Sequence, residues 1–147
     1  MQSQSKVREL CRVHGLAATH QRVIIYRAVT ARPGHYSPED VYNLVRRQIP
    51  SISLATVYKN LKTFVAHGML RELHPGAGPL RVDPTLERHH HLVCTRCGAV
   101  RDVASSWLVP VRARRPAPRG FRVREFKVDA LGLCRKCARK RSPRSRS

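Results

Sequence analysis

Four of the chain's cysteines stand in two Cys-x-x-Cys pairs, Cys94 with Cys97 and Cys134 with Cys137. Each pair can turn two thiolates toward one ion, and four soft sulfur ligands suit a closed tetrahedral Zn²⁺ site. Two disulfides or a redox dithiol are the alternative, but an intracellular compartment keeps thiols reduced. We therefore expect structural zinc that clips together the two ends of a small C-terminal domain, whose folding depends on the metal.

Consecutive histidines, His89, His90 and His91, lie just before the first cysteine pair. Side chains on a strand alternate between its two faces, so His89 and His91 point the same way and can hold one metal ion. A solvated or stacking histidine cluster near nucleic acid explains this stretch by itself equally well. Metal ligation is favoured by further donor residues at expected element ends: His35, Asp83 and Asp102.

The first half of the chain is predicted to fold as helices that start at capping side chains. The expected N-caps are Thr19, Ser37 and Ser53, each followed by a stretch with an apolar face. Helices are expected over residues 6–14, 21–31, 38–47 and 53–67, followed by short strands at 69–74 and 79–83 around a turn at 75–78. Helices followed by a small hairpin indicate a winged helix-turn-helix, whose second inner helix is 53–67.

A change in composition after residue 83 marks 84–88 as a hinge between one domain at 1–83 and another at 89–140. Strands are expected within 89–94, 99–103 and 121–134, with a proline-interrupted stretch at 107–120 between them. The basic end, 141–147, has nothing apolar to bury and is expected to be disordered. The predicted fold class is α+β, with a winged helix-turn-helix domain followed by a small α/β dimerisation domain that the four-cysteine zinc site clips together.

The charge balance restricts the partner. The chain has 29 Lys and Arg residues against 9 Asp and Glu residues, a formal net charge of +20. A compact protein tolerates this self-repulsion best beside a polyanion, so nucleic acid is the leading candidate. The N-terminus has no apolar signal core, and no apolar run is long enough to span a bilayer. We expect a soluble, cytoplasmic protein with no membrane partner.

Short motifs follow one another in a fixed order: THQR (19–22), HYSPEDVY (35–42), SLATVYKNL (53–61), RVD (81–83), HHHLVCTRCG (89–98) and CRKC (134–137). Through these motifs the chain resembles the ferric uptake regulator family of metal-dependent repressors, over about residues 7–139. The resemblance implies a homodimer, held by the second domain, that binds a palindromic operator in double-stranded DNA.

Within that family the chain most resembles the peroxide-sensing branch, in which three histidines and two aspartates hold a regulatory metal. The matching positions are His35, Asp83, His89, His91 and Asp102. This mixed nitrogen and oxygen set suits Fe²⁺ or Mn²⁺, and because the ligands come from both domains, metal binding would fix the hinge. The resemblance further implies that Fe²⁺ and peroxide together oxidise His35 or His89, so that the metal leaves and repression ends.

Several departures distinguish the branches. Iron-sensing relatives usually have Glu in place of Asp102, and zinc-sensing relatives usually add a cysteine near the wing, whereas none occurs here between Cys11 and Cys94. Phe126 and His90 replace the histidine and the acid of a second site that many iron sensors carry. Peroxide sensing is therefore favoured, and an iron- or manganese-responsive repressor without peroxide sensing is the alternative.

The helix at 53–67 is expected to enter the major groove of DNA. Tyr58 would offer apolar contact to thymine methyl groups, and the other expected contacts to bases or phosphates are Thr56, Lys59 and Asn60. Ala17 stands where relatives have a basic residue that reaches the minor groove, and His20 replaces a usual proline. The proline-rich stretch at 110–118 should disrupt a helix that relatives keep in the dimerisation domain.

Two other classes of function compete with this interpretation. A basic, zinc-containing RNA-binding module would explain the charge and the cysteines, but it leaves His35, Asp83 and Asp102 unexplained. A zinc hydrolase needs an open metal position and a placed general base, and no motif such as His-Glu-x-x-His occurs, so we expect no enzyme. The remaining cysteine, Cys11, is interpreted as a small buried hydrophobe, with a reactive thiol as the alternative.

Overall fold

A computed structural model describes residues 3–73, 79–124, 126 and 128–140. The predicted turn at 75–78 and the predicted disordered tail at 141–147 lie outside the described residues. The chain divides between Leu86 and Glu87 into two compact units, called here the N-terminal and the C-terminal unit. Each unit is described by itself. No helix among the described residues is long and apolar enough to cross a bilayer.

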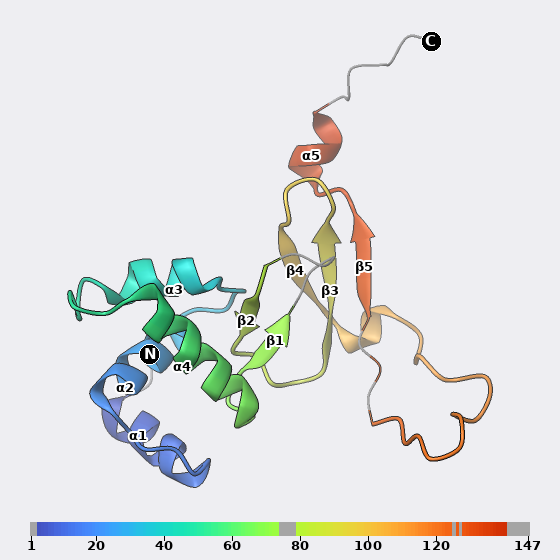
Figure 1. Ribbon diagram of the computed structural model, residues 1–147. Coiled ribbons are helices and arrows are strands. Elements are labelled where there is room, and N and C mark those ends of the chain that lie inside the picture. The colour runs from blue at the N-terminus through green and yellow to red at the C-terminus, as the bar shows by residue number, and fades with distance from the viewer. Residues whose placement is uncertain (1–2, 74–78, 125, 127, 141–147) are drawn as a thin grey trace. The chain divides into compact units, whose positions relative to one another are not determined.

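The N-terminal unit contains the helices α1 (Gln4–Val13), α2 (His20–Thr30), α3 (Pro38–Val45) and α4 (Leu54–Ala66), shown in blue to green in Figure 1. The predicted N-caps are confirmed, because the side chains of Thr19, Ser37 and Ser53 each accept a hydrogen bond from a first-turn backbone N–H. Ser37 also forms a capping box with Asp40. These bonds satisfy donors that a helix start otherwise leaves unpaired, which is why the helices begin where they do.

The C-terminal ends of α1 and α4 are tied to each other. Gly15 and Gly68 follow these helices with φ of +69° at each, the left-handed conformation that glycine adopts without strain. The two C-cap histidines exchange hydrogen bonds across this point. The Nδ1 of His14 donates to the carbonyl oxygen of His67 over 2.7 Å, and the Nδ1 of His67 donates to that of His14 over 2.8 Å.

One apolar cluster fills the N-terminal unit and draws on all four helices. Phe64 is its largest fully buried side chain, with its ring edge-on to that of Tyr26 at 5.3 Å between centroids. Cys11 belongs to the same cluster and is fully buried, which confirms its interpretation as a small hydrophobe, and burial raises the pKa of its thiol.

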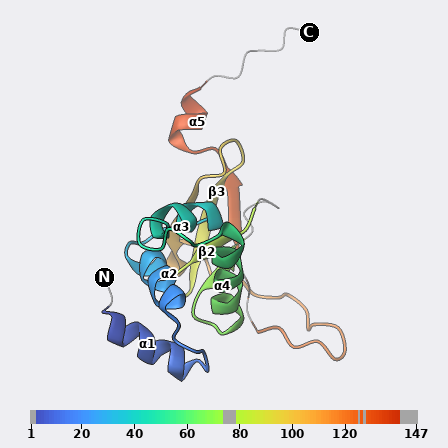
Figure 2. The same cartoon turned by 60° about the vertical axis from the view of Figure 1, so that its left-hand side comes forward.

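Two antiparallel strands complete this unit as the wing, β1 (Arg71–Leu73) and β2 (Arg81–Asp83). Within the described residues they cover the inner part of the strands predicted at 69–74 and 79–83, and Met69, Leu70 and Leu80 beside them are buried. Val82 of β2 belongs to the apolar cluster of the helices, which gives the predicted winged helix-turn-helix. Its two inner helices, α3 and α4, pack against each other, and α4 is the second of them (Figure 2).

The C-terminal unit is built on a three-stranded sheet of β3 (His89–Cys94), β4 (Val100–Ala104) and β5 (Asp129–Gly132). The central strand β3 pairs antiparallel with β4 and parallel with β5, as Figure 1 shows. A short 3-10 turn η2 (Ser105–Trp107) follows β4, and the short helix α5 (Arg135–Arg139) follows β5. The first two strands lie within one residue of their predicted positions.

The third predicted strand is confirmed over only part of its range. The sequence favours a strand within 121–134, but β5 begins only at Asp129, where pairing with His91 of β3 starts. Just before it, the carbonyl oxygen of Val128 accepts a hydrogen bond from the N–H of His91, whereas residues 108–124 contain neither helix nor strand. Prolines in this stretch lack the N–H that either structure would need.

Candidate metal centres

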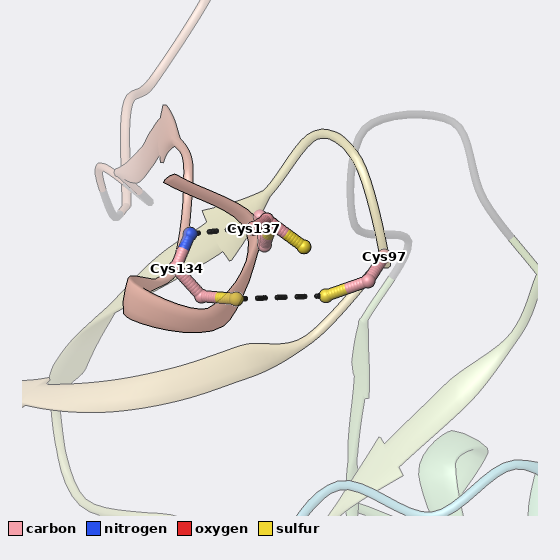
Figure 3. Close-up of side chains that lie close together, drawn as sticks. Cys97, Cys134 and Cys137 are labelled. Atoms are coloured by element: carbon pink, nitrogen blue, oxygen red, sulfur yellow. Dashed lines mark hydrogen bonds between the residues drawn. The ribbon is translucent and has the colours of Figure 1, made fainter. Parts of the chain in front are cut away.

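The cysteines of the C-terminal unit converge at one end of its sheet. Cys94 ends β3, Cys97 lies in the turn that follows, Cys134 is the N-cap of α5, and Cys137 lies within α5. Their sulfur atoms all lie within 4.8 Å of one another, and the Sγ atoms of Cys97 and Cys134 face each other at 3.8 Å (Figure 3). Four sulfurs placed tetrahedrally about 2.3 Å from Zn²⁺ are about 3.8 Å apart, so the arrangement fits structural zinc.

Hydrogen bonds from backbone N–H groups favour the thiolate form of two of the cysteines, which is the form that binds a cation. The N–H of Cys134 donates to the Sγ of Cys94 over 3.3 Å. This bond, aided by the N–H of Cys97, lowers the pKa of Cys94 to about 6, while the N–H of Cys137 lowers the pKa of Cys134. Desolvation instead raises the pKa of Cys137 to about 12. A bound metal ion is what allows all four sulfurs to be thiolates together.

A second cluster, called here the sheet cluster, consists of His89, His91 and Asp102. The register of the sheet places His91 directly opposite Asp102 on β4, and His89 is two residues away on β3. The Oδ1 of Asp102 lies 3.5 Å from the Nε2 of His89 and 3.7 Å from the Nε2 of His91. The predicted His-x-His pair thus points to one place, beside a carboxylate.

The orientation of the imidazoles decides what the sheet cluster can bind. The Nδ1 of His89 donates to the carbonyl oxygen of Glu87 over 2.8 Å, and the Nδ1 of His91 donates to the Oδ1 of Asp129 over 3.2 Å. With the proton on Nδ1, each Nε2 carries a lone pair. These Nε2 atoms are 3.0 Å apart, and two nitrogens about 2.1 Å from one ion at right angles are also about 3.0 Å apart. The cluster fits a metal cation.

Asp129 was not predicted from the sequence. It lies on β5 opposite His91, on the side away from Asp102, and orients the imidazole through Nδ1. A carboxylate in this position fixes the tautomer of a ligand histidine and raises its basicity. The only signal in the sequence is an acid on a strand just before the second cysteine pair, and that signal does not reveal the parallel pairing.

The N-terminal unit holds the other predicted regulatory ligands. A β-bridge between Tyr36 and Val82, with backbone hydrogen bonds of 3.0 and 2.9 Å, places His35 beside the end of the wing strand β2. The Nε2 of His35 lies 3.9 Å from the Oδ2 of Asp83, and the side chains of both residues are almost wholly buried. A buried carboxylate needs a partner or a cation. Two of the five predicted ligands therefore belong to the N-terminal unit and three to the C-terminal unit.

The predicted DNA-contacting residues lie on α4. Tyr58 is 44% exposed and Lys59 is also exposed, so both are accessible to a partner. Asn60 is instead engaged within the unit, because its Nδ2 donates to the carbonyl oxygen of Thr56 over 2.8 Å and its Oδ1 accepts from the Nε of Arg22 over 3.3 Å. Asn60 therefore helps to position α4 against α2.

Comparisons with known proteins agree with this architecture. The model of the "Ferric uptake regulator family" matches residues 13–130. The peroxide operon regulator of Bacillus subtilis (strain 168) is 30% identical over 126 residues, which cover 86% of this chain and 87% of that protein.

Two solved structures share the fold. The ferric uptake regulator from Pseudomonas aeruginosa with manganese is 25% identical, with a TM-score of 0.67, over 87% of this chain and 97% of that chain. A zinc uptake regulator complexed with zinc and DNA is 21% identical, with a TM-score of 0.61, over 92% of this chain and 93% of that chain.

Proposed function

The chain belongs to the ferric uptake regulator family, and from this premise we propose that it is a metal-dependent transcriptional repressor, not an enzyme, that senses peroxide. The observation that carries the metal dependence is the pair of Nε2 atoms of His89 and His91, 3.0 Å apart beside Asp102. Peroxide sensing is supported by the similarity to the Bacillus subtilis regulator. Because its ligand thiols must stay reduced, the proposal places the protein in the cytoplasm.

The regulatory site is proposed to unite the sheet cluster with His35 and Asp83 of the N-terminal unit on one Fe²⁺ or Mn²⁺ ion. The donor set of imidazole nitrogens and carboxylate oxygens supports this choice of metals over copper(I). A site with ligands from both units favours the one arrangement of the units in which all of them reach the ion. Metal binding would select a DNA-competent state by its differential affinity, typically about 1 to 3 kcal/mol.

DNA binding is assigned to α4 of the winged helix-turn-helix. Its exposed Tyr58 and Lys59 would read the major groove of a palindromic operator, with one α4 from each subunit of a homodimer. The zinc uptake regulator of the same fold that was solved with DNA supports this assignment.

Release is proposed to follow from damage to a ligand. Fe²⁺, when bound, would supply the redox chemistry with which peroxide oxidises an adjacent imidazole, so that one peroxide oxygen is added to a ring carbon and the other leaves as water. His35 or His89 gains one oxygen atom and becomes a poorer nitrogen donor, so the ligand set no longer holds the two units in the DNA-competent arrangement.

The test is anaerobic loading with Fe²⁺, followed by stoichiometric peroxide, peptide mass mapping and operator-binding measurements. We expect a gain of one oxygen on His35 or His89 and loss of operator binding, with neither change when Mn²⁺ replaces Fe²⁺. Asp102→Glu is the internal control, which should keep metal-dependent DNA binding but reduce oxidation. Unmodified histidines with retained DNA binding would reject peroxide sensing and favour an iron- or manganese-responsive repressor.

A further inference from the structure

The C-terminal unit contains a hollow of about 590 Å³ that is rich in arginine. Arg88, Arg114, Arg115 and Arg124 line it and come from three separate stretches of the chain. We call it the arginine hollow. None of the described residues that line it is acidic. It is distinct from both candidate metal centres, because none of their proposed ligands lines it.

Three of the four arginines of the hollow lie in one segment, residues 108–124, and are exposed. Between Asp102 and Glu125 the sequence has no acidic residue but has arginines at positions 112, 114, 115, 119, 122 and 124. Residues 108–124 form no helix or strand and appear as the long orange loop in Figure 1. Prolines at 110, 116 and 118 restrict the backbone of this segment, so the segment loses less conformational entropy when it binds a partner.

Among the described residues, the arginines of the hollow are available for a partner. Elsewhere, Arg12 pairs with Glu9 and Arg96 donates to the carbonyl oxygen of Cys137. In the described part of the chain, the four arginines of the hollow make no hydrogen bond or ion pair. Their like charges raise the local positive potential, which a concave surface focuses further. An anion that entered the hollow would remove this repulsion.

The arrangement favours an extended polyanion over a single small anion. Guanidinium groups bind phosphate oxygens through paired N–H donors, and several of them along one segment match successive phosphates of one strand. Val123 and Phe126 also line the hollow and are 44% exposed each, so they offer apolar contact to sugars between phosphates. We infer that the arginine hollow binds the backbone phosphates of double-stranded DNA. The hollow is a second DNA-binding surface, separate from α4. It contacts the DNA backbone whatever the base sequence of the DNA.

The first experiment measures the affinity of the zinc-loaded full chain for a random-sequence duplex across a range of salt concentrations, without Fe²⁺ or Mn²⁺. The variant Arg114→Gln/Arg115→Gln removes two proposed phosphate contacts, so the slope of log K against log salt should fall by about 1.8. The matched control is Arg119→Gln/Arg122→Gln, which removes the same charge from the same segment outside the hollow. We expect a clearly smaller change. Equal changes in both variants would mean diffuse charge and would overturn the inference.

The second experiment maps the contact directly, by arginine modification with phenylglyoxal and peptide mass analysis of the wild-type chain. A random duplex should protect Arg114, Arg115 and Arg124 but leave Arg119 and Arg122 reactive. Protection by inorganic tripolyphosphate but not by the duplex would overturn the DNA assignment in favour of a free polyphosphate. Both experiments omit the regulatory metal and the operator, so failure of the proposed repressor function would not alter their outcome.

Discussion

The two units are stabilised by different means. In the N-terminal unit, side chains from all four helices and the wing pack into one apolar cluster. In the described part of the C-terminal unit, the only buried hydrophobic residues are Val93, Cys94 and Cys137, and two of these are proposed zinc ligands. A domain with so small a core needs another source of stability, and thiolate coordination of zinc can supply it. The difference implies that one unit depends on packing and the other on metal.

The same difference separates what each unit can offer for function. The apolar core of the N-terminal unit fixes α4 so that its outer face is available for recognition. In the C-terminal unit, polar side chains occupy the sheet, where His91 lies between Asp102 and Asp129 on the neighbouring strands. Metal-ligating side chains occupy positions in the sheet that apolar side chains could otherwise fill. The C-terminal unit therefore has less apolar packing and depends more on structural zinc.

The largest expected effect is the loss of zinc. Cys97→Ser should release one zinc ion per chain and unfold the C-terminal unit, because an apparent zinc-binding free energy of about 10 to 16 kcal/mol exceeds what so small a core provides. Hydrogen exchange measured by mass spectrometry should show lost protection after residue 87 and retained protection in α1 to α4. Cys11→Ala is the control and should keep its zinc. Full protection of β3 and β5 without zinc would contradict this division.

The next effect is specific to the other unit. Phe64→Ala removes a fully buried ring that packs against Tyr26, and it should lower the free energy of unfolding of the N-terminal unit by about 3 to 5 kcal/mol. Urea denaturation followed by helix circular dichroism measures the change, and zinc content should stay at the wild-type level. Phe121→Ala, at a ring that is 66% exposed, should change stability by less than about 0.5 kcal/mol. Similar costs for both variants would show that burial does not distinguish these positions.

These two predictions also indicate which features the sequence reveals. Helix starts were predictable because the signal is local, as in the capping box of Ser37 and Asp40. The Cys-x-x-Cys pairs and the His-x-His pair were predictable because spacing and strand alternation bring each pair to one side. The start of β5 was not, since the strand exists only where β3 offers a partner.

Long-range partners escaped prediction for the same reason. Asp129 orients His91 through a parallel register that no local pattern encodes. The hydrogen bonds between His14 and His67 join residues far apart in sequence, at helix ends that look ordinary. In each case the residue type was visible, but its partner depended on how distant elements pack.

A smaller effect concerns metal affinity in the sheet. Asp129→Asn weakens the acceptor that holds His91 in the tautomer with a lone pair on Nε2, so Mn²⁺ affinity should fall by about 10- to 100-fold. Zinc content should not change. Anaerobic titration calorimetry measures the affinity, and Glu9→Gln, at an acid of α1 in the other unit, is the control. Unchanged Mn²⁺ affinity would show that Asp129 has no part in the site.

The smallest effect tests whether packing is sufficient for the N-terminal unit. His14→Ala and His67→Ala each remove one of the two hydrogen bonds that join the ends of α1 and α4, so each should cost about 0.5 to 1.5 kcal/mol. Both bonds hold the same two helix ends, so loss of one loosens the geometry that the other needs. The double variant should therefore cost less than the sum of the single variants in urea denaturation. His20→Ala, at the first residue of α2, is the control for loss of an imidazole. If the free-energy costs of the two single variants were strictly additive, the apolar cluster alone would fix the position of these helix ends. Neither hydrogen bond would then affect the geometry of the other.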